Sequence, residues 1–173
     1  MIRFRQIAVR LSIAGIVTSL PLLLLLLIVM EPLAACSASL PLRRLTPGLA
    51  SYTFNSGMTT AQELLINDTE TFELAWRQIH ARRRPQPELP AIDFETNSVI
   101  IVAAGQQSSG GVEIRIDLVY QDGSIVIIDV TTIKPGDTCV VSTGLTQPVD
   151  IAVVPKIEGP HEFRVSSHIR DCK

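Results

Sequence analysis

The stretch from Val112 to Thr132 constrains the fold most, because apolar and polar residues alternate around a turn signal within it. Every second residue before the turn is apolar: Val112, Ile114, Ile116 and Leu118. Asp122-Gly123 follows, and Ile125 to Thr132 is again rich in β-branched residues. Alternation that flanks Asp-Gly is a strong signal for a β-hairpin. This part of the chain is therefore predicted to form two strands, with those four apolar side chains facing inward.

Further elements are predicted on both sides of this hairpin. Residues 69–81 have apolar side chains at helical spacing, and Asn67 or Asp68 can cap the helix. Apolar or β-branched runs predict further strands at residues 62–67, 98–103, 139–142, 149–154 and 161–166. The predicted fold class is α+β, with a mostly antiparallel sheet of about seven strands and one packed helix.

The first 35 residues are predicted to be a signal peptide that lies outside the fold. Arg3, Arg5 and Arg10 precede an uncharged, leucine-rich stretch from Leu11 to Met30. A basic start, an apolar stretch and small residues before a cleavage site are the features of a secretory signal. The alternative is an uncleaved transmembrane helix, since roughly 20 apolar residues can span a bilayer. Both interpretations place the rest of the chain outside the cytoplasm, because arginines remain on the cytoplasmic side.

Leu33-Ala34-Ala35-Cys36 resembles the lipobox of bacterial lipoproteins, in which the chain is cut before a lipidated cysteine. We therefore expect a lipid anchor at Cys36, a tether over residues 36–57 and a domain over residues 58–173. The expected location is the cell envelope, on the outer side of the cytoplasmic membrane or on the outer membrane. Cleavage removes three arginines and Glu31, which changes the formal charge from −2 to −4. Such a chain lacks the basic character that nucleic-acid binding requires.

The cysteine count predicts one disulfide. With Cys36 lipidated, Cys139 and Cys172 are the remaining pair. An even remainder in an oxidising compartment favours a bond between them. The alternative is two free or buried thiols.

The sequence contains no recognisable catalytic or metal-binding pattern. His80, His161 and His168 have no metal-ligand spacing, and we expect the last two to lie on the surface. Ser108 to Gly111 is a loop of small residues and not a nucleophile elbow. We therefore predict no metal, no cofactor and no enzymatic activity.

Two polar loops form the candidate binding surface. The residues predicted to contact a partner are Gln106, Gln107, Ser108, Ser109, Gly110, Gly111, Thr146 and Gln147. Binding residues are found disproportionately on loops that a rigid scaffold positions. Bulky residues in place of Gly110 and Gly111 are then expected to weaken binding without unfolding the domain. The alternative is that both loops are solvated connectors.

The order of several short motifs over about residues 58–156 resembles a known family. The motifs are Trp76, Leu89 to Phe94, Ser98 to Val102, Gly105, Ser109 to Gly111, Glu113 to Ile116, Lys134 to Cys139, Thr146 to Pro148 and Val153 to Lys156. Together they resemble the PrcB C-terminal domain, named for a small lipoprotein subunit of a bacterial protease complex. Val112 departs from the pattern, because members of the family often carry an aromatic residue there.

This resemblance implies a non-catalytic accessory domain that binds or stabilises an exported protease or another envelope protein. A second hypothesis, from a different class, is a lipoprotein that binds an envelope polymer or a small ligand. That hypothesis predicts a pocket lined by aromatic side chains, for which Trp76, Tyr52 and Tyr120 are candidates. An enzyme of unrecognised type is a third possibility.

Overall fold

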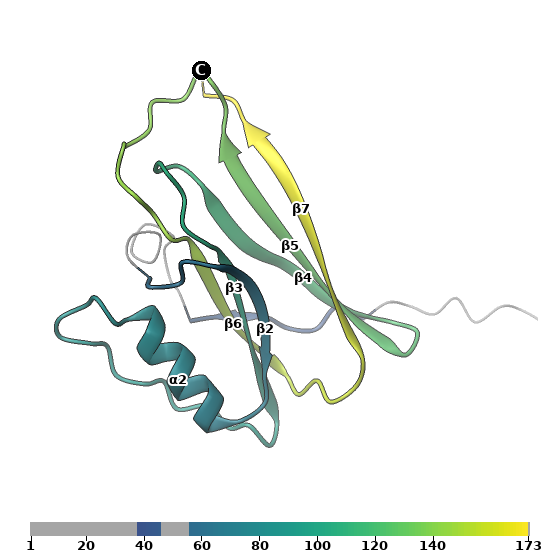
Figure 1. The fold of residues 1–173 in the computed structure, drawn as a ribbon. Coiled ribbons are helices and arrows are strands. Elements are labelled where there is room, and N and C mark those ends of the chain that lie inside the picture. Colours follow the sequence, from purple (N-terminus) through teal and green to yellow (C-terminus); the bar gives the residue numbers. More distant parts are fainter. Residues whose placement is uncertain (1–37, 46–55, 173) are drawn as a thin grey trace, which may run out of the picture. The chain divides into compact units, whose positions relative to one another are not determined.

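The computed structural model describes residues 38–45 and 56–172, all within the unit Cys36–Lys173. The predicted signal peptide and lipid anchor lie outside the described residues. The described part is mostly β-structure, with seven strands in two sheets and one helix (Figure 1). In chain order the elements are β1 (Arg43–Arg44), β2 (Ala61–Ile66), α2 (Thr69–Ile79), β3 (Asn97–Ala104), β4 (Glu113–Asp122), β5 (Ile125–Pro135), β6 (Val149–Pro155) and β7 (His161–Arg170). Among the described residues, no helix has the length and apolar character needed to cross a bilayer.

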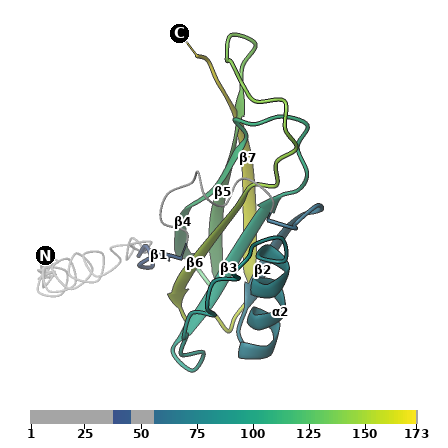
Figure 2. The ribbon, with the colours of Figure 1, turned by 90° about the vertical axis from the view of Figure 1, so that its left-hand side faces the viewer.

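The strands form two sheets that pack face to face, and α2 covers the outer face of one of them (Figure 2). The four-stranded sheet has the order β1-β6-β3-β2, and the three-stranded sheet has the order β4-β5-β7. Strands β3 and β6 are therefore buried on both faces. In β3, Val99 and Ile101 belong to the cluster beneath α2, whereas Ile100 and Val102 face the other sheet. This double burial explains why β3 is a continuous apolar run and does not alternate.

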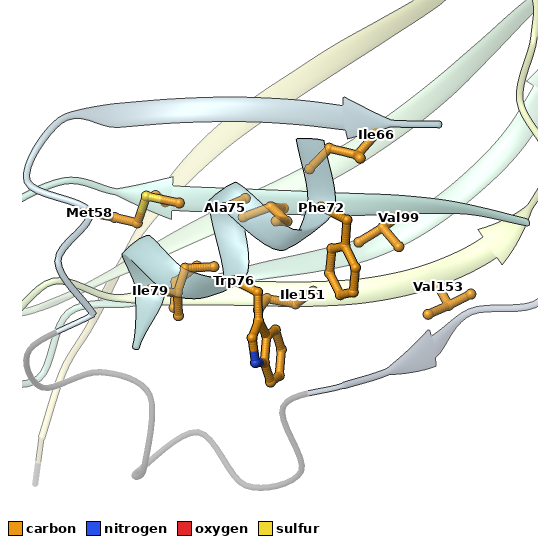
Figure 3. Close-up of a cluster of buried hydrophobic side chains, with 12 residues drawn as sticks. Met58, Ile66, Phe72, Ala75, Trp76, Ile79, Val99, Ile151 and Val153 are labelled. Atoms are coloured by element: carbon orange, nitrogen blue, oxygen red, sulfur yellow. The ribbon is translucent and has the colours of Figure 1, made fainter. Parts of the chain in front are cut away.

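The helix α2 begins where the sequence predicted. Asp68 is the N-cap, and its Oδ1 accepts a 2.8 Å hydrogen bond from the backbone N–H of Thr71. The buried side chains of Phe72, Trp76 and Ile79 recur at helical spacing and pack on the four-stranded sheet (Figure 3). The helix ends at Ile79, two residues before the predicted end, and His80 is the C-cap.

The predicted single, mostly antiparallel sheet differs from the observed arrangement. The β4–β5 hairpin has the expected antiparallel pairing, but it belongs to a separate sheet with β7. After β5 the chain returns to the four-stranded sheet as β6, which pairs with β3. It then crosses back as β7, which pairs with β5 in parallel. These long-range pairings have no signature in local sequence, which specifies the hairpin alone.

In the β4–β5 hairpin, Leu118 faces outward, opposite to the prediction. The pairing of β4 with β5 shifts register between Ile116 and Leu118, as in a β-bulge. An extra residue in one strand reverses the alternation beyond it. As a result Leu118 is 43% exposed, and Val119 is buried in its place. The prediction that Leu118 faces inward was wrong for this reason.

Residues 38–45 lie on the domain, whereas the sequence placed them in a tether. Strand β1 pairs with β6, and Leu40 and Leu42 pack against the cluster between the sheets. Residues 46–55, the next part of the predicted tether, lie outside the described residues. The segment 139–142, predicted as a strand, forms none, and Val140 within it is fully exposed.

A buried carboxylate joins the two sheets. Asp150 of β6 is 3% exposed, and its Oδ2 accepts a 3.0 Å hydrogen bond from the backbone N–H of Ile116 at the β4 bulge. Its Oδ1 accepts from the N–H of Ile151 at 3.0 Å. The guanidinium of Arg44 pairs with the Asp150 Oδ2 at 3.2 Å and also donates to the carbonyl of Ile116. The carboxylate therefore connects β1, β4 and β6.

Candidate functional site

The two sheets separate along one side of the domain and leave a cleft of about 270 Å³. One wall is the β2 edge, with Ala61 and Glu63, and the other is β7, with Val165 and Ser167. The floor between them includes Ile114, Thr132 and Ala104. We refer to this space as the edge cleft. Three of its lining residues, Ala61, Ala103 and Ala104, have side chains of a single methyl group, which leaves space between the two sheets.

Both walls of the edge cleft are the last strands of their sheets. β2 ends the four-stranded sheet and β7 ends the three-stranded sheet. An edge strand has backbone N–H and C=O groups that no neighbouring strand pairs, and these can hydrogen-bond to an added strand. The edge cleft is therefore flanked by two backbone edges on which an extended polypeptide can be accommodated.

The two faces of β7 differ in chemistry. Its pairing with β5 places Phe163, Val165 and Ile169 on the face toward the other sheet, because they stand opposite Ile128, Val130 and Lys134. Val165 is 51% exposed and Ile169 is 73% exposed, although both lie on this less polar face. The opposite face carries Glu162, Arg164, His168 and Arg170. An incoming strand would therefore present apolar residues to the cleft and polar residues to solvent.

The predicted loop at residues 106–111 reaches the edge cleft at only one of its residues. Gln107 lines the cleft, and its backbone pairs with that of Thr146 at 2.8 and 3.1 Å. Gln106 and Ser108 are exposed but do not line it. The side chain of Thr146 is buried and donates to the Ser109 carbonyl, while Gln147 is buried below the loop. The side chains of Thr146 and Gln147 therefore hold the loop from within the domain and are not exposed on its surface.

Gly110 and Gly111 have a structural role. A Cβ at Gly110 would lie 2.4 Å from Ser142 Oγ. Gly111 has a φ of +86°, and a Cβ there would lie 2.9 Å from a methyl carbon of Val141. The expectation that bulky residues at these positions leave the fold intact therefore conflicts with the geometry of the loop. A test of binding needs a different residue.

The structure contains the disulfide between Cys139 and Cys172. The bond closes the end of the domain where β5 and β7 finish, close to the hydrogen bond from the Gly136 N–H to the Arg170 carbonyl (2.9 Å). It therefore attaches the end of β7, one wall of the edge cleft, to the loop that follows β5.

His161 and His168 are exposed, as the sequence predicted, whereas His80 is completely buried beside Trp76. Burial, with a smaller contribution from the charge of Arg83, lowers the pKa of His80 to about 4. Within residues 38–45 and 56–172 no three side chains of His, Cys, Asp or Glu are grouped as metal ligands would be.

The lowered pKa of His80 predicts that stability falls on acidification. Between pH 6.5 and 4 the unfolded chain binds a proton that the folded chain does not, so stability decreases as the pH falls through that window. The shift corresponds to roughly 3 kcal/mol of unfolding free energy. Denaturant melts of the wild type and His80→Gln at several pH values test this. A shallower pH dependence in the variant is expected, and parallel curves would contradict it.

Comparison with known proteins gives one match. The family model described as PrcB C-terminal matches residues 98–155, in agreement with the resemblance drawn from the motifs. The match covers β3 to β6, of which β3, β4 and β5 supply the floor of the edge cleft, while both walls come from the flanking strands β2 and β7. No curated protein and no solved structure matches the chain.

Proposed function

Since residues 98–155 match the family model described as PrcB C-terminal, we propose that the chain is an exported, lipid-anchored accessory protein that binds a partner protein. The partner is an exported protease or another protein of the envelope, and the edge cleft is the surface that binds it. The domain performs no chemistry itself. Its contribution is to hold or stabilise the partner at the membrane.

The observation that carries this proposal is the open wall of β7. Ten residues of strand edge lie beside an exposed, less polar face that includes Val165 and Ile169. Natural proteins usually protect long exposed edges against pairing with other chains. An edge that is left open beside a cleft is suited to strand addition, in which backbone hydrogen bonds give affinity and side-chain positions give specificity.

The composition of the cleft favours a polypeptide over a carbohydrate. None of the described residues that line it is aromatic. Of the three candidates for an aromatic pocket, Trp76 lies in the core beneath α2 and Tyr120 does not line the cleft, while Tyr52 lies outside the described residues. One acidic and one basic side chain, Glu63 and Lys134, line the cleft. A bound segment with alternating apolar and polar residues fits this surface better than a sugar, which commonly stacks on aromatic rings.

A pair of matched substitutions tests the proposal. Val165→Glu introduces a charge into the cleft at a half-exposed position, whereas Leu74→Glu introduces the same charge on the exposed side of α2. Surface substitutions of this kind change stability by about 0.5 kcal/mol or less. The native lipoprotein is isolated from detergent-solubilised membranes, and the proteins that remain bound are identified by mass spectrometry.

We expect one recurring exported protein, a protease, to be retained by the wild type and by Leu74→Glu and to be lost with Val165→Glu. Equal retention by both variants would place the contact elsewhere on the domain. No recurring protein, even after mild cross-linking, would contradict the accessory role.

A further inference from the structure

The chain between the predicted anchor and β1 is fastened to the edge of β4. The backbone N–H of Leu40 donates to the Val119 carbonyl at 2.7 Å, and the N–H of Gln121 donates to the Ala38 carbonyl at 3.4 Å. Ser39 and Tyr120 form an isolated antiparallel bridge between these two bonds. Residues 38–40 thus extend the three-stranded sheet by a short strand-like segment at the β4 edge.

The same segment then crosses to the other sheet and is fastened there. Arg43 and Arg44 pair with β6, and the Leu45 N–H donates to the Ile151 carbonyl at 2.9 Å. Arg44 is held further by the buried Asp150. Residues 38–45, which we refer to as the strap, therefore close the sandwich on the side away from the edge cleft. Backbone hydrogen bonds, the ion pair between Arg44 and the buried Asp150, and the packed side chains of Leu40 and Leu42 hold the strap in place.

From this geometry we infer that the end of the domain with the β4–β5 turn faces the lipid headgroups. The inference rests on the proposed lipid anchor at Cys36. Two peptide units separate Cys36 from Ala38, which is at most about 7 Å of chain. Since Ala38 is bonded to Gln121, at the end of β4, an acyl chain on Cys36 leaves no free tether between the membrane and the domain.

Two segments at this end of the domain lack basic residues. They are the β4–β5 turn, residues 121–125, and residues 158–160, where the Pro160 carbonyl accepts from the Val126 N–H at 3.0 Å. These two segments contain Asp122 and Glu158 and no lysine or arginine. Anionic lipids attract basic segments, so these two segments supply no such attraction. The nearest arginine, Arg164, is paired with Glu162 and contacts Tyr120.

With the β4–β5 turn at the membrane, the edge cleft lies at the end of the domain that is farther from the lipid. Thr132, on the cleft floor, lies seven residues along β5 from Ile125 at the turn. Seven residues of strand span roughly 23 Å. The cleft and the Cys139–Cys172 disulfide are therefore at the opposite end of the three-stranded sheet, where a partner protein has access to them. The strap therefore holds the domain, and with it the edge cleft, in a fixed orientation relative to the membrane. A flexible tether would leave that orientation free.

Two glycines provide matched positions for fluorescent labels. A Cβ at Gly159 or at Gly144 meets no atom within 4 Å, and neither residue has a positive φ. Gly159 lies at the end with the β4–β5 turn, and Gly144 lies in the loop before the Thr146 bridge, at the opposite end. Gly159→Cys and Gly144→Cys are labelled in the acylated full-length protein, reconstituted in vesicles that carry a short-range quencher on the lipid headgroups.

We expect the label at position 159 to lose most of its fluorescence and the label at position 144 to lose little. A flexible spacer of twelve Gly and Ser residues, inserted after Ser37, leaves the strap intact and should restore most of the fluorescence at position 159. Such a spacer has an average span of about 19 Å. The unlipidated Cys36→Ser protein should show no quenching at either position.

The outcomes separate this inference from the proposed function on which it rests. An acylated protein with equal quenching at both positions, or with quenching that the spacer does not change, would contradict the fixed orientation of the domain. It would not contradict the lipid anchor at Cys36. A protein that carries no acyl group, by intact mass, would overturn both.

Discussion

Replacing Asp150 with alanine is expected to lower the free energy of unfolding by about 3–5 kcal/mol, the largest effect that we predict for a single substitution, because it leaves buried hydrogen-bond donors without their acceptor. The Asp150 carboxylate is buried and accepts hydrogen bonds from the N–H groups of Ile116 and Ile151 as well as from Arg44. Its removal leaves two interior N–H groups without this acceptor and a guanidinium without its counter-charge. Each buried N–H left without an acceptor costs about 1–3 kcal/mol, whereas the half-exposed guanidinium of Arg44 can still be solvated.

Chemical denaturation of the wild type and of Asp150→Ala measures this loss directly. Asp117→Ala is the matched control, because Asp117 is paired with Arg115 at the surface and lies beside the same bulge. Surface ion pairs contribute about 1 kcal/mol or less. Similar losses in the two variants would mean that Asp150 does not join the sheets as described.

Loss of the Cys139–Cys172 disulfide is expected to destabilise the domain by about 3–4 kcal/mol, the second-largest effect. The bond closes a loop with a sequence separation of 33 residues, which contains both β6 and β7. Cross-linking a loop of that length restricts the unfolded chain, and in the chain-entropy model this restriction is the origin of the stabilisation. Because β7 pairs with β5 alone, its C-terminal end should also loosen when the bond is absent.

The double variant Cys139→Ser/Cys172→Ser tests this prediction in denaturant melts. A reducing agent should lower the stability of the wild type to that of the double variant and should leave the double variant unchanged. A difference below about 1 kcal/mol would contradict the entropic account and would mean that strand pairing alone holds the end of β7.

The elements with strong local signals could be predicted from the sequence. The helix α2 has a capping residue at Asp68 and apolar residues at helical spacing, and the β4–β5 hairpin has alternation around Asp122-Gly123. Leu118 was placed on the wrong face because of the bulge after Ile116, whose N–H bonds to the Asp150 carboxylate of the other sheet. No local pattern reports such a contact.

The strap could not be predicted because its order depends on distant residues. Leu40 and Leu42 lie in a segment rich in Ser, Pro and Leu without clear periodicity, which resembles a linker. Its structure comes from pairing with β4 and β6, which are about 80 to 110 residues away in sequence. Asp150, the single acid in the otherwise apolar run Val149 to Val154, is a sequence signal from which a partner outside its own strand could have been predicted.

The candidate site could be predicted only in part. Loop composition directed attention to residues 106–111, of which Gln107 alone lines the edge cleft. The walls come from β2 and β7, which are about 100 residues apart and have no motif in common. An alternation in β7 was visible in the sequence, with Phe163, Val165 and Ile169 between charged residues. Alternation predicts that one face is buried, and it cannot reveal that the structure leaves Val165 and Ile169 exposed.

The most direct test of the account is the hydrogen exchange of backbone amides in the purified domain, with and without the partner that it retains from membranes. Strand addition at the edge cleft predicts that partner binding slows exchange in β7, residues 161–170, or in β2, residues 61–66. Exchange in the β4–β5 turn, residues 121–125, should not change. Protection confined to that turn or to α2, with both edges exchanging as in the free domain, would contradict the account.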